Sequence, residues 1–143
     1  MPTPARGRSG KAAMTGSCGR RPPRTASQMR RGDVYWVDFE PIRGSEADKT
    51  RPAVVVSNDA ANRSAERARR GVITVVPLTS NVNRVLPFQV RLRAADCGLA
   101  GDSKAQAEQV RAVAFHRLGK RIGRVPDTTL AKLDNALRLH LGL

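Results

Sequence analysis

The stretch Thr50-Arg51-Pro52-Ala53-Val54-Val55-Val56-Ser57 decides the fold, because a charged segment runs directly into a proline and a β-branched apolar run. Proline lacks an N–H and restricts the residue before it, so we expect Arg51 to be extended at the mouth of a strand. The three valines predict a strand with both faces covered. Two interpretations of Arg51 carry equal weight. It is a guanidinium fixed to grip a phosphate, with Lys49 nearby, or a surface arginine that begins a core strand.

The length of 143 residues suits one domain with a hydrophobic core, and the net charge of +14 predicts a polyanionic partner. Nucleic acid is the first candidate, and a membrane is less favoured because no apolar run approaches the roughly 20 residues that span a bilayer. Aromatic residues make up 3% of the chain, which excludes an RNA-binding surface of many stacked rings. Cys18 and Cys97 are isolated, so we expect no disulfide framework, no zinc site and a reducing, cytoplasmic compartment.

Residues 1–28 are predicted to form a disordered basic extension. They carry six basic residues and no acidic one, and they are rich in proline, glycine and serine. This segment is either a loose nucleic-acid-binding arm or, as we favour, a dispensable extension, because Met29 resembles a natural start. The domain is therefore expected to span residues 29–143, whose 20 basic and 12 acidic residues still give a net charge of +8.

Alternating polarity predicts a first strand at residues 32–40, with Trp36 and Phe39 in the core, and an exposed loop from there to residue 50. A short helical turn is expected within residues 58–70. Further strands are predicted at residues 71–78, 87–93, 104–113 and 121–125. Within residues 87–93 the apolar side chains are expected to face inward, and Gln89, Arg91 and Arg93 to face outward.

An amphipathic helix is predicted after Pro126, with Asp127 or Thr128 as its cap. Leu130 and Leu133 begin a leucine stripe at helical spacing, which packs on the sheet or on a partner. Several short strands without βαβ alternation, followed by one helix, predict a mainly β fold with a C-terminal helix. The expected architecture is a small, strongly bent antiparallel sheet or barrel.

Small polar residues follow the strand at residues 71–78, so Thr79, Ser80 and Asn81 are held at a strand exit. There they hydrogen-bond phosphate, ribose or bases, or they are simply turn residues. The sequence contains no P-loop, GxGxxG or HExxH motif, and no cluster with metal-ligand spacing. The residues alone therefore predict a basic nucleic-acid-binding β domain and name no reaction.

Four ordered motifs resemble those of the MazF/PemK (Kid) family, the toxins of toxin–antitoxin pairs. They are MRRGDVYWVDF at 29–39, GSE at 44–46 with KTRPAVVVSN at 49–58, VPLTS at 76–80 and KAQAEQVR at 104–111. The resemblance covers about residues 29–143. Four motifs at consistent spacing are far more specific than any one of them.

The resemblance implies a small SH3-like antiparallel β-barrel, a homodimer and a sequence-specific endoribonuclease that cuts single-stranded mRNA without a metal or other cofactor. Cleavage would leave 2′,3′-cyclic phosphate and 5′-OH ends and inhibit translation and growth. An acidic segment of a cognate antitoxin would cover the RNA groove. The family's essential arginine and threonine correspond to Arg51 and Thr79, and Glu46 matches an acid that matters in some members. The expected RNA contacts are Lys49, Ser57, Asn58, Ser80, Asn81, Glu108 and Gln109.

The expected roles follow from the chemistry of these groups. A guanidinium stays protonated and is a poor base, so Arg51 is expected to stabilise charge and to donate a proton to the leaving oxygen. The Thr79 hydroxyl would bond the phosphate, and the general base is unassigned, with Glu46 as a candidate. Two alternatives remain on the same fold. One is a non-catalytic module that binds nucleic acid or the antitoxin, and the other, less favoured because Arg51 and Thr79 are both present, is a toxin of DNA gyrase.

Overall fold

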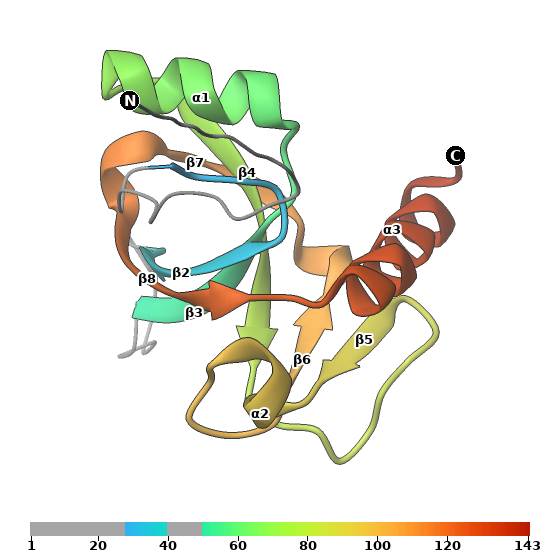
Figure 1. The fold of residues 1–143 in the computed structure, drawn as a ribbon. Helices are drawn as coiled ribbons and strands as arrows, with labels where there is room; N and C mark the ends of the chain where they lie inside the picture. Colours follow the sequence, from blue (N-terminus) through green and yellow to red (C-terminus); the bar gives the residue numbers. More distant parts are fainter. Residues whose placement is uncertain (1–27, 40–49) are drawn as a thin grey trace, which may run out of the picture.

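The computed structural model describes residues 28–39 and 50–143, and within them seven strands form one antiparallel sheet. The strands are β2 (Asp33–Asp38), β3 (Thr50–Val55), β4 (Val72–Thr79), β5 (Gln89–Leu92), β6 (Ser103–Gln106), β7 (Arg111–Ala114) and β8 (Leu118–Arg124). Their order is β5-β6-β4-β3-β2-β8, with β7 also beside β4 (Figure 1). The predicted mainly β fold is confirmed, as a barrel-like sheet that does not close.

The helical elements are α1 (Asp59–Ala68), α2 (Ala94–Cys97), α3 (Asp127–Leu141) and two 3₁₀ turns, η1 (Ala107–Gln109) and η2 (Phe115–Arg117). α1 is longer than the predicted turn, because Asn58 caps its start and Arg69 ends it in a left-handed conformation. α3 confirms the predicted C-terminal helix, although Asp127 is its first residue rather than a side-chain cap. In the described part of the chain, no helix combines the length and apolarity that crossing a membrane requires.

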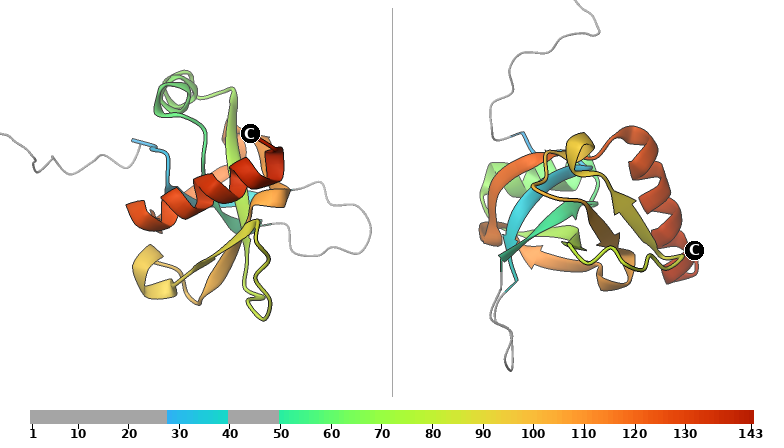
Figure 2. Two further views of the ribbon diagram at one scale, coloured as in Figure 1. Left: turned by 90° about the vertical axis from the view of Figure 1, so that its right-hand side faces the viewer. Right: turned by 90° about the horizontal axis from the view of Figure 1, so that it is seen from below.

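Side chains of the strands alternate between two cores on opposite faces of the sheet. The first core contains Val34, Val54, Val76 and, from α3, Leu133. The second core contains Val37, Val55, Val75 and, from α1, Ala65. The two long helices lie apart, with α3 packed against β5 and η1 and α1 against β4 (Figure 2). Both faces of β3 are thus covered, as its valine run predicts.

Residues 104–113 form two short strands instead of the single predicted strand. Both pair with the same edge of β4, where Leu78 is opposite Ala105 and Val75 is opposite Arg111. Three residues of β4 therefore correspond to six residues of the other chain segment, and the turn η1 takes up the extra three. This turn places Glu108 and Gln109 outside the ladder.

Two side chains lie differently from their prediction. Trp36 was expected in the core but is 42% exposed, because it faces a surface hollow beside Pro52. Gln89 was expected to face solvent but is 7% exposed, because its amide bonds neighbouring protein groups. Phe39 is buried, as expected.

Candidate active site

The site is organised around the end of the sheet where β3 begins and β4 ends. Ala53 of β3 is opposite Pro77 of β4, and the same register continued by two residues sets Thr79 beside Arg51. Adjacent strands lie about 5 Å apart, so the two side chains are neighbours. Val55 and Val75, which share their alternation, point into the second core. Arg51 and Thr79, which the resemblance names as the essential arginine and threonine, therefore lie on the same face of the sheet.

The Arg51 side chain is half-buried on this face. Within residues 28–39 and 50–143, no hydrogen bond or ion pair engages its guanidinium. A guanidinium on a rigid strand carries five fixed donors, and leaving them unpaired in a partly desolvated place costs free energy. The arrangement suits an anion that supplies the missing acceptors.

Thr79 is the last residue of β4, and its hydroxyl is oriented by the chain that follows. The Thr79 Oγ1 atom accepts a hydrogen bond from the Asn81 amide at 3.3 Å, and the Asn81 side chain in turn accepts one from the Asn83 amide at 3.2 Å. Because the hydroxyl oxygen is the acceptor, its proton remains to be donated outward. Ser80 and Asn81 are exposed beside it.

The strand β6 adds a lysine that the sequence interpretation did not single out. Lys104 pairs with Thr79, and Arg91 of β5 pairs with Lys104, so these residues and Arg51 share one side of the sheet. The Lys104 side chain is 9% exposed and its Nζ donates to the Arg84 carbonyl at 2.5 Å. The sequence alone does not show that Lys104 is paired with Thr79, because this pairing depends on the register of β6 against β4.

One acid offsets part of this positive charge. The Ala94 amide and the Arg91 guanidinium, which is 3.0 Å away, hold the pKa of Asp102 below its usual range. Asp102 is therefore an anion at neutral pH and is matched to Arg91. The other basic residues on this side of the sheet include Arg51, Lys104 and Arg111, which is opposite Val75.

Glu108 and Gln109, expected to contact RNA, lie in η1 beside β4 and β5. The Glu108 Oε2 atom accepts a hydrogen bond from the Gln89 amide at 2.8 Å, and its Oε1 atom is buried without a partner among the described residues. Gln109 is exposed. The Glu108 carboxylate is thus engaged by the protein, whereas the Gln109 amide is open to a ligand.

Ser57 and Asn58 are not brought to the Arg51 site. They follow the other end of β3, about 20 Å away at the usual rise per strand residue. The Ser57 hydroxyl donates to the Asn62 side chain at 2.5 Å and accepts from the Thr74 amide at 3.2 Å. The Asn58 side chain accepts from the Ala61 amide at 2.8 Å and so caps α1. The side chains of Ser57 and Asn58, both predicted RNA contacts, are thus hydrogen-bonded within the protein, where they hold α1 against the sheet.

Glu46 and Lys49 lie outside the described residues, as does the predicted extension up to residue 27. The chain leaves β2 after Asp38 and re-enters the sheet at Thr50, which is paired with Asp38. Asp38 and Thr50 lie at the same end of the sheet as Arg51. The roles of Glu46 as base and of Lys49 as an RNA contact remain predictions.

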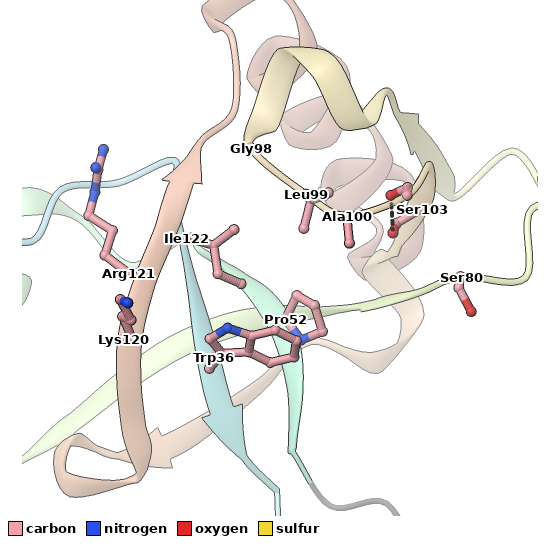
Figure 3. Close-up of a pocket in the computed structure, with 11 residues that line it drawn as sticks. Trp36, Pro52, Ser80, Gly98, Leu99, Ala100, Ser103, Lys120, Arg121 and Ile122 are labelled. Carbon is pink, nitrogen blue, oxygen red and sulfur yellow. Dashed lines mark hydrogen bonds between the residues drawn. The ribbon is translucent and has the colours of Figure 1, made fainter.

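A hollow of about 500 Å³ opens on the opposite face of β3 (Figure 3). Trp36, Pro52 and Ile122 point into it from β2, β3 and β8, and Leu99 closes it from the segment after α2. Ser80 lies at its rim, so the hollow and the Arg51 face meet at the end of β4.

Burial raises the pKa of the Cys97 thiol, helped by the charge of Asp96, so this thiol is neutral and not a nucleophile. Within the described residues, no group of three or more histidine, cysteine or acidic side chains gathers around a metal-sized space.

Comparison with known proteins shows the family of the chain. The family model described as PemK-like, MazF-like toxin of type II toxin–antitoxin system matches residues 30–141. The endoribonuclease MazF9 of Mycobacterium tuberculosis is 61% identical over 115 residues, which are 80% of this chain and 98% of the relative.

Solved structures agree in fold. A mycobacterial endoribonuclease in complex with its cognate antitoxin superposes with a TM-score of 0.62 at 30% identity, covering 80% of this chain and 96% of that one. MazF from Deinococcus radiodurans gives a TM-score of 0.65 at 28% identity, with 80% and 97% coverage.

Proposed function

The chain belongs to the PemK-like, MazF-like toxins of type II toxin–antitoxin systems, and on this premise we propose that it cuts single-stranded RNA at Arg51 and Thr79 without a metal ion. The observation that carries the proposal is the pair itself. Among the described residues, nothing bonds the Arg51 guanidinium, and the Thr79 hydroxyl beside it on the neighbouring strand accepts a hydrogen bond and keeps its own donor. The named relatives with this fold are endoribonucleases.

The proposed reaction is an internal transfer of the phosphoryl group. The ribose 2′-OH loses its proton to a base and attacks the adjacent phosphorus, and the bond from phosphorus to the 5′-oxygen breaks. The products are a 2′,3′-cyclic phosphate and a 5′-OH, which takes up a proton. Because the nucleophile is the 2′-OH, the reaction distinguishes RNA from DNA.

Arg51 meets the negative charge that builds on the phosphate oxygens and supplies the proton to the leaving oxygen. Removal of one preorganised donor of this kind typically costs about 10²–10³ in rate. The Thr79 hydroxyl donates a hydrogen bond to a second phosphate oxygen. Glu46 is the candidate for the base. Ser80, Asn81 and Gln109, which are exposed, would contact the RNA beside the reacting phosphate.

We further propose that the partner is an antitoxin whose acidic segment covers the same positive face, that the toxin is a homodimer and that it acts in the cytoplasm. A net charge of +8 over residues 29–143 supports an acidic partner. The affinity of the complex should then fall as salt rises, because the attraction between exposed charges is screened. An affinity that ignores ionic strength would contradict this part of the proposal.

The test is to incubate the purified chain with a long single-stranded RNA in excess EDTA and to map the new ends. We expect discrete cuts at one short word, with 2′,3′-cyclic phosphate and 5′-OH termini. The matched control is Arg51→Ala, which should leave the RNA intact. Intact RNA with the unaltered chain, while a related active toxin cuts it, would reject the endoribonuclease and leave a binding module.

A further inference from the structure

The segment that leaves the site after Thr79 is held by two buried polar side chains. Residues 80–88, which we name the site loop, connect β4 to β5 and carry Asn81, Asn83 and Arg84 on the surface. Lys104 and Gln89, which lie beneath this loop, are 9% and 7% exposed. Lysine is almost never buried to this degree without a specific partner.

Both side chains bond the backbone of the site loop. The Lys104 ammonium donates to the Arg84 carbonyl at 2.5 Å, and the Gln89 side-chain oxygen Oε1 accepts from the Leu86 backbone amide at 3.0 Å. The Gln89 amide also donates to Glu108, which ties the loop to η1. Because Lys104 is paired with Thr79 across the ladder, the loop is fastened directly beside the reacting groups.

Stability alone does not explain a buried ammonium at this position. Desolvating a charge is expensive, and an apolar side chain of similar volume is often neutral or better for the free energy of unfolding. A charge that is bonded to one loop carbonyl instead fixes where that loop lies. Within the described residues, no hydrogen bond or ion pair engages the Arg84 guanidinium or the side-chain amide of Asn83, and both residues are exposed.

We propose that Lys104 and Gln89 are positioning residues for substrate recognition, which hold the site loop so that Asn83 and Arg84 read the bases next to the scissile phosphate. The proposal rests on the function proposed above. Amide and guanidinium groups are those that hydrogen-bond the edges of unstacked bases in single-stranded RNA. A loop already fixed in its bound conformation loses less entropy on binding, and it accepts fewer alternative words.

The test compares the cleavage words of variants on a pool of single-stranded RNA with randomised sequence, read by sequencing the new ends. Lys104→Met keeps the volume and removes the bond to the Arg84 carbonyl, and Arg84 itself belongs to an exposed part of the loop. We expect kcat/KM on the preferred word to fall about tenfold, the lower end of the loss for one hydrogen bond to a charged group, while cuts at related words increase. Lys104→Arg, which keeps a donor, should restore part of the selectivity.

The matched control is Lys132→Met, which removes the same charge from the exposed surface of α3 and should leave the word unchanged. Hydrogen exchange gives a readout that does not depend on RNA. The backbone amides of Asn83 and Leu86 should exchange faster in Lys104→Met than in the unaltered chain. Exchange elsewhere in the sheet should be the same in both, which shows that the variant is folded.

Two outcomes would overturn the proposal while leaving the endoribonuclease intact. The first is an unchanged word and unchanged kcat/KM in Lys104→Met. The second covers a variant that does not fold: Arg84→Ala and Asn83→Ala leave the anchors untouched, and an unchanged word in both would show that the loop reads nothing. If the unaltered chain cuts no RNA, the endoribonuclease and this inference fall together.

Discussion

The two ends of β3 look alike in sequence and differ in structure. Each end carries polar residues next to the valine run, with Arg51 at the start and Ser57 and Asn58 after the last valine. At the Ser57 end, the side chains are bonded to Asn62, Thr74 and Ala61. At the Arg51 end, no described group bonds the guanidinium.

The difference shows that a polar residue at a strand end becomes a candidate site only when the fold leaves it unpaired. Buried and half-buried polar groups are nearly always hydrogen-bonded in native structures, so those at the Ser57 end are accounted for by the fold. The Arg51 guanidinium, which no described residue bonds, is the exception that we attribute to a ligand. The following predictions test this division, in order of expected effect.

Arg51→Ala should lower the rate of RNA cleavage by about 10²–10³, the usual cost of removing one preorganised donor to a developing charge. The urea midpoint of unfolding should hardly move, because no described group loses a partner. Single-turnover cleavage of an RNA with the mapped word measures the first quantity and urea unfolding the second. Arg51→Lys keeps the positive charge but lacks the paired donors of the planar guanidinium, so it should recover only part of the rate. Full activity in Arg51→Ala would contradict the proposed role of Arg51 in stabilising charge and donating a proton.

Thr79→Val replaces the hydroxyl with a methyl group of similar volume. A hydrogen bond to a charged group is worth about 1.5–3 kcal/mol, so kcat/KM should fall roughly 10- to 150-fold. Thr79→Ser keeps the hydroxyl and is the control, with an expected loss of only a few-fold. The two variants are compared on the same RNA under single-turnover conditions. Equal activity of the valine and serine variants would show that the hydroxyl does not bond the phosphate.

Asn62→Ala tests the other end of β3. Asn62 is fully buried, its amide donates to the Ser57 carbonyl at 2.8 Å, and its oxygen accepts from the Ser57 hydroxyl. Leaving these buried groups unpaired should reduce the free energy of unfolding by about 1–3 kcal/mol. Cleavage well below the unfolding midpoint should be unchanged. Asn135→Ala, at an exposed position of α3, is the control and should alter neither quantity.

The two strands that carry Arg51 and Thr79 could be predicted for a clear physical reason, whereas the roles of the two residues come from the family resemblance and stay predictions. A proline and an apolar run fix each strand, and two adjacent antiparallel strands bring the start of one beside the end of the next. The sequence did not predict that the Ser57 hydroxyl is hydrogen-bonded to the Asn62 side chain and the Thr74 amide, because these partners depend on how α1 packs on the sheet. It also missed Lys104, because the three-residue shift at η1 is invisible in a run that reads as one strand. Trp36 was misplaced because aromatic character indicates burial but not the hollow beside it.

Asn58→Ala is expected to have the smallest effect and separates the two ends most directly. The Asn58 side chain caps α1, so its loss should cost about 1 kcal/mol of unfolding free energy, within the usual range of about 0.5–2. Asn58→Ser, which also caps helices well, should be nearly as stable as the unaltered chain. Cleavage rate and word should be the same in all three proteins. If Asn58 contacted RNA instead, both variants would lose cleavage regardless of their stability, since neither retains the side-chain amide. The end of β3 that carries Ser57 would then have to be counted as part of the RNA-binding site.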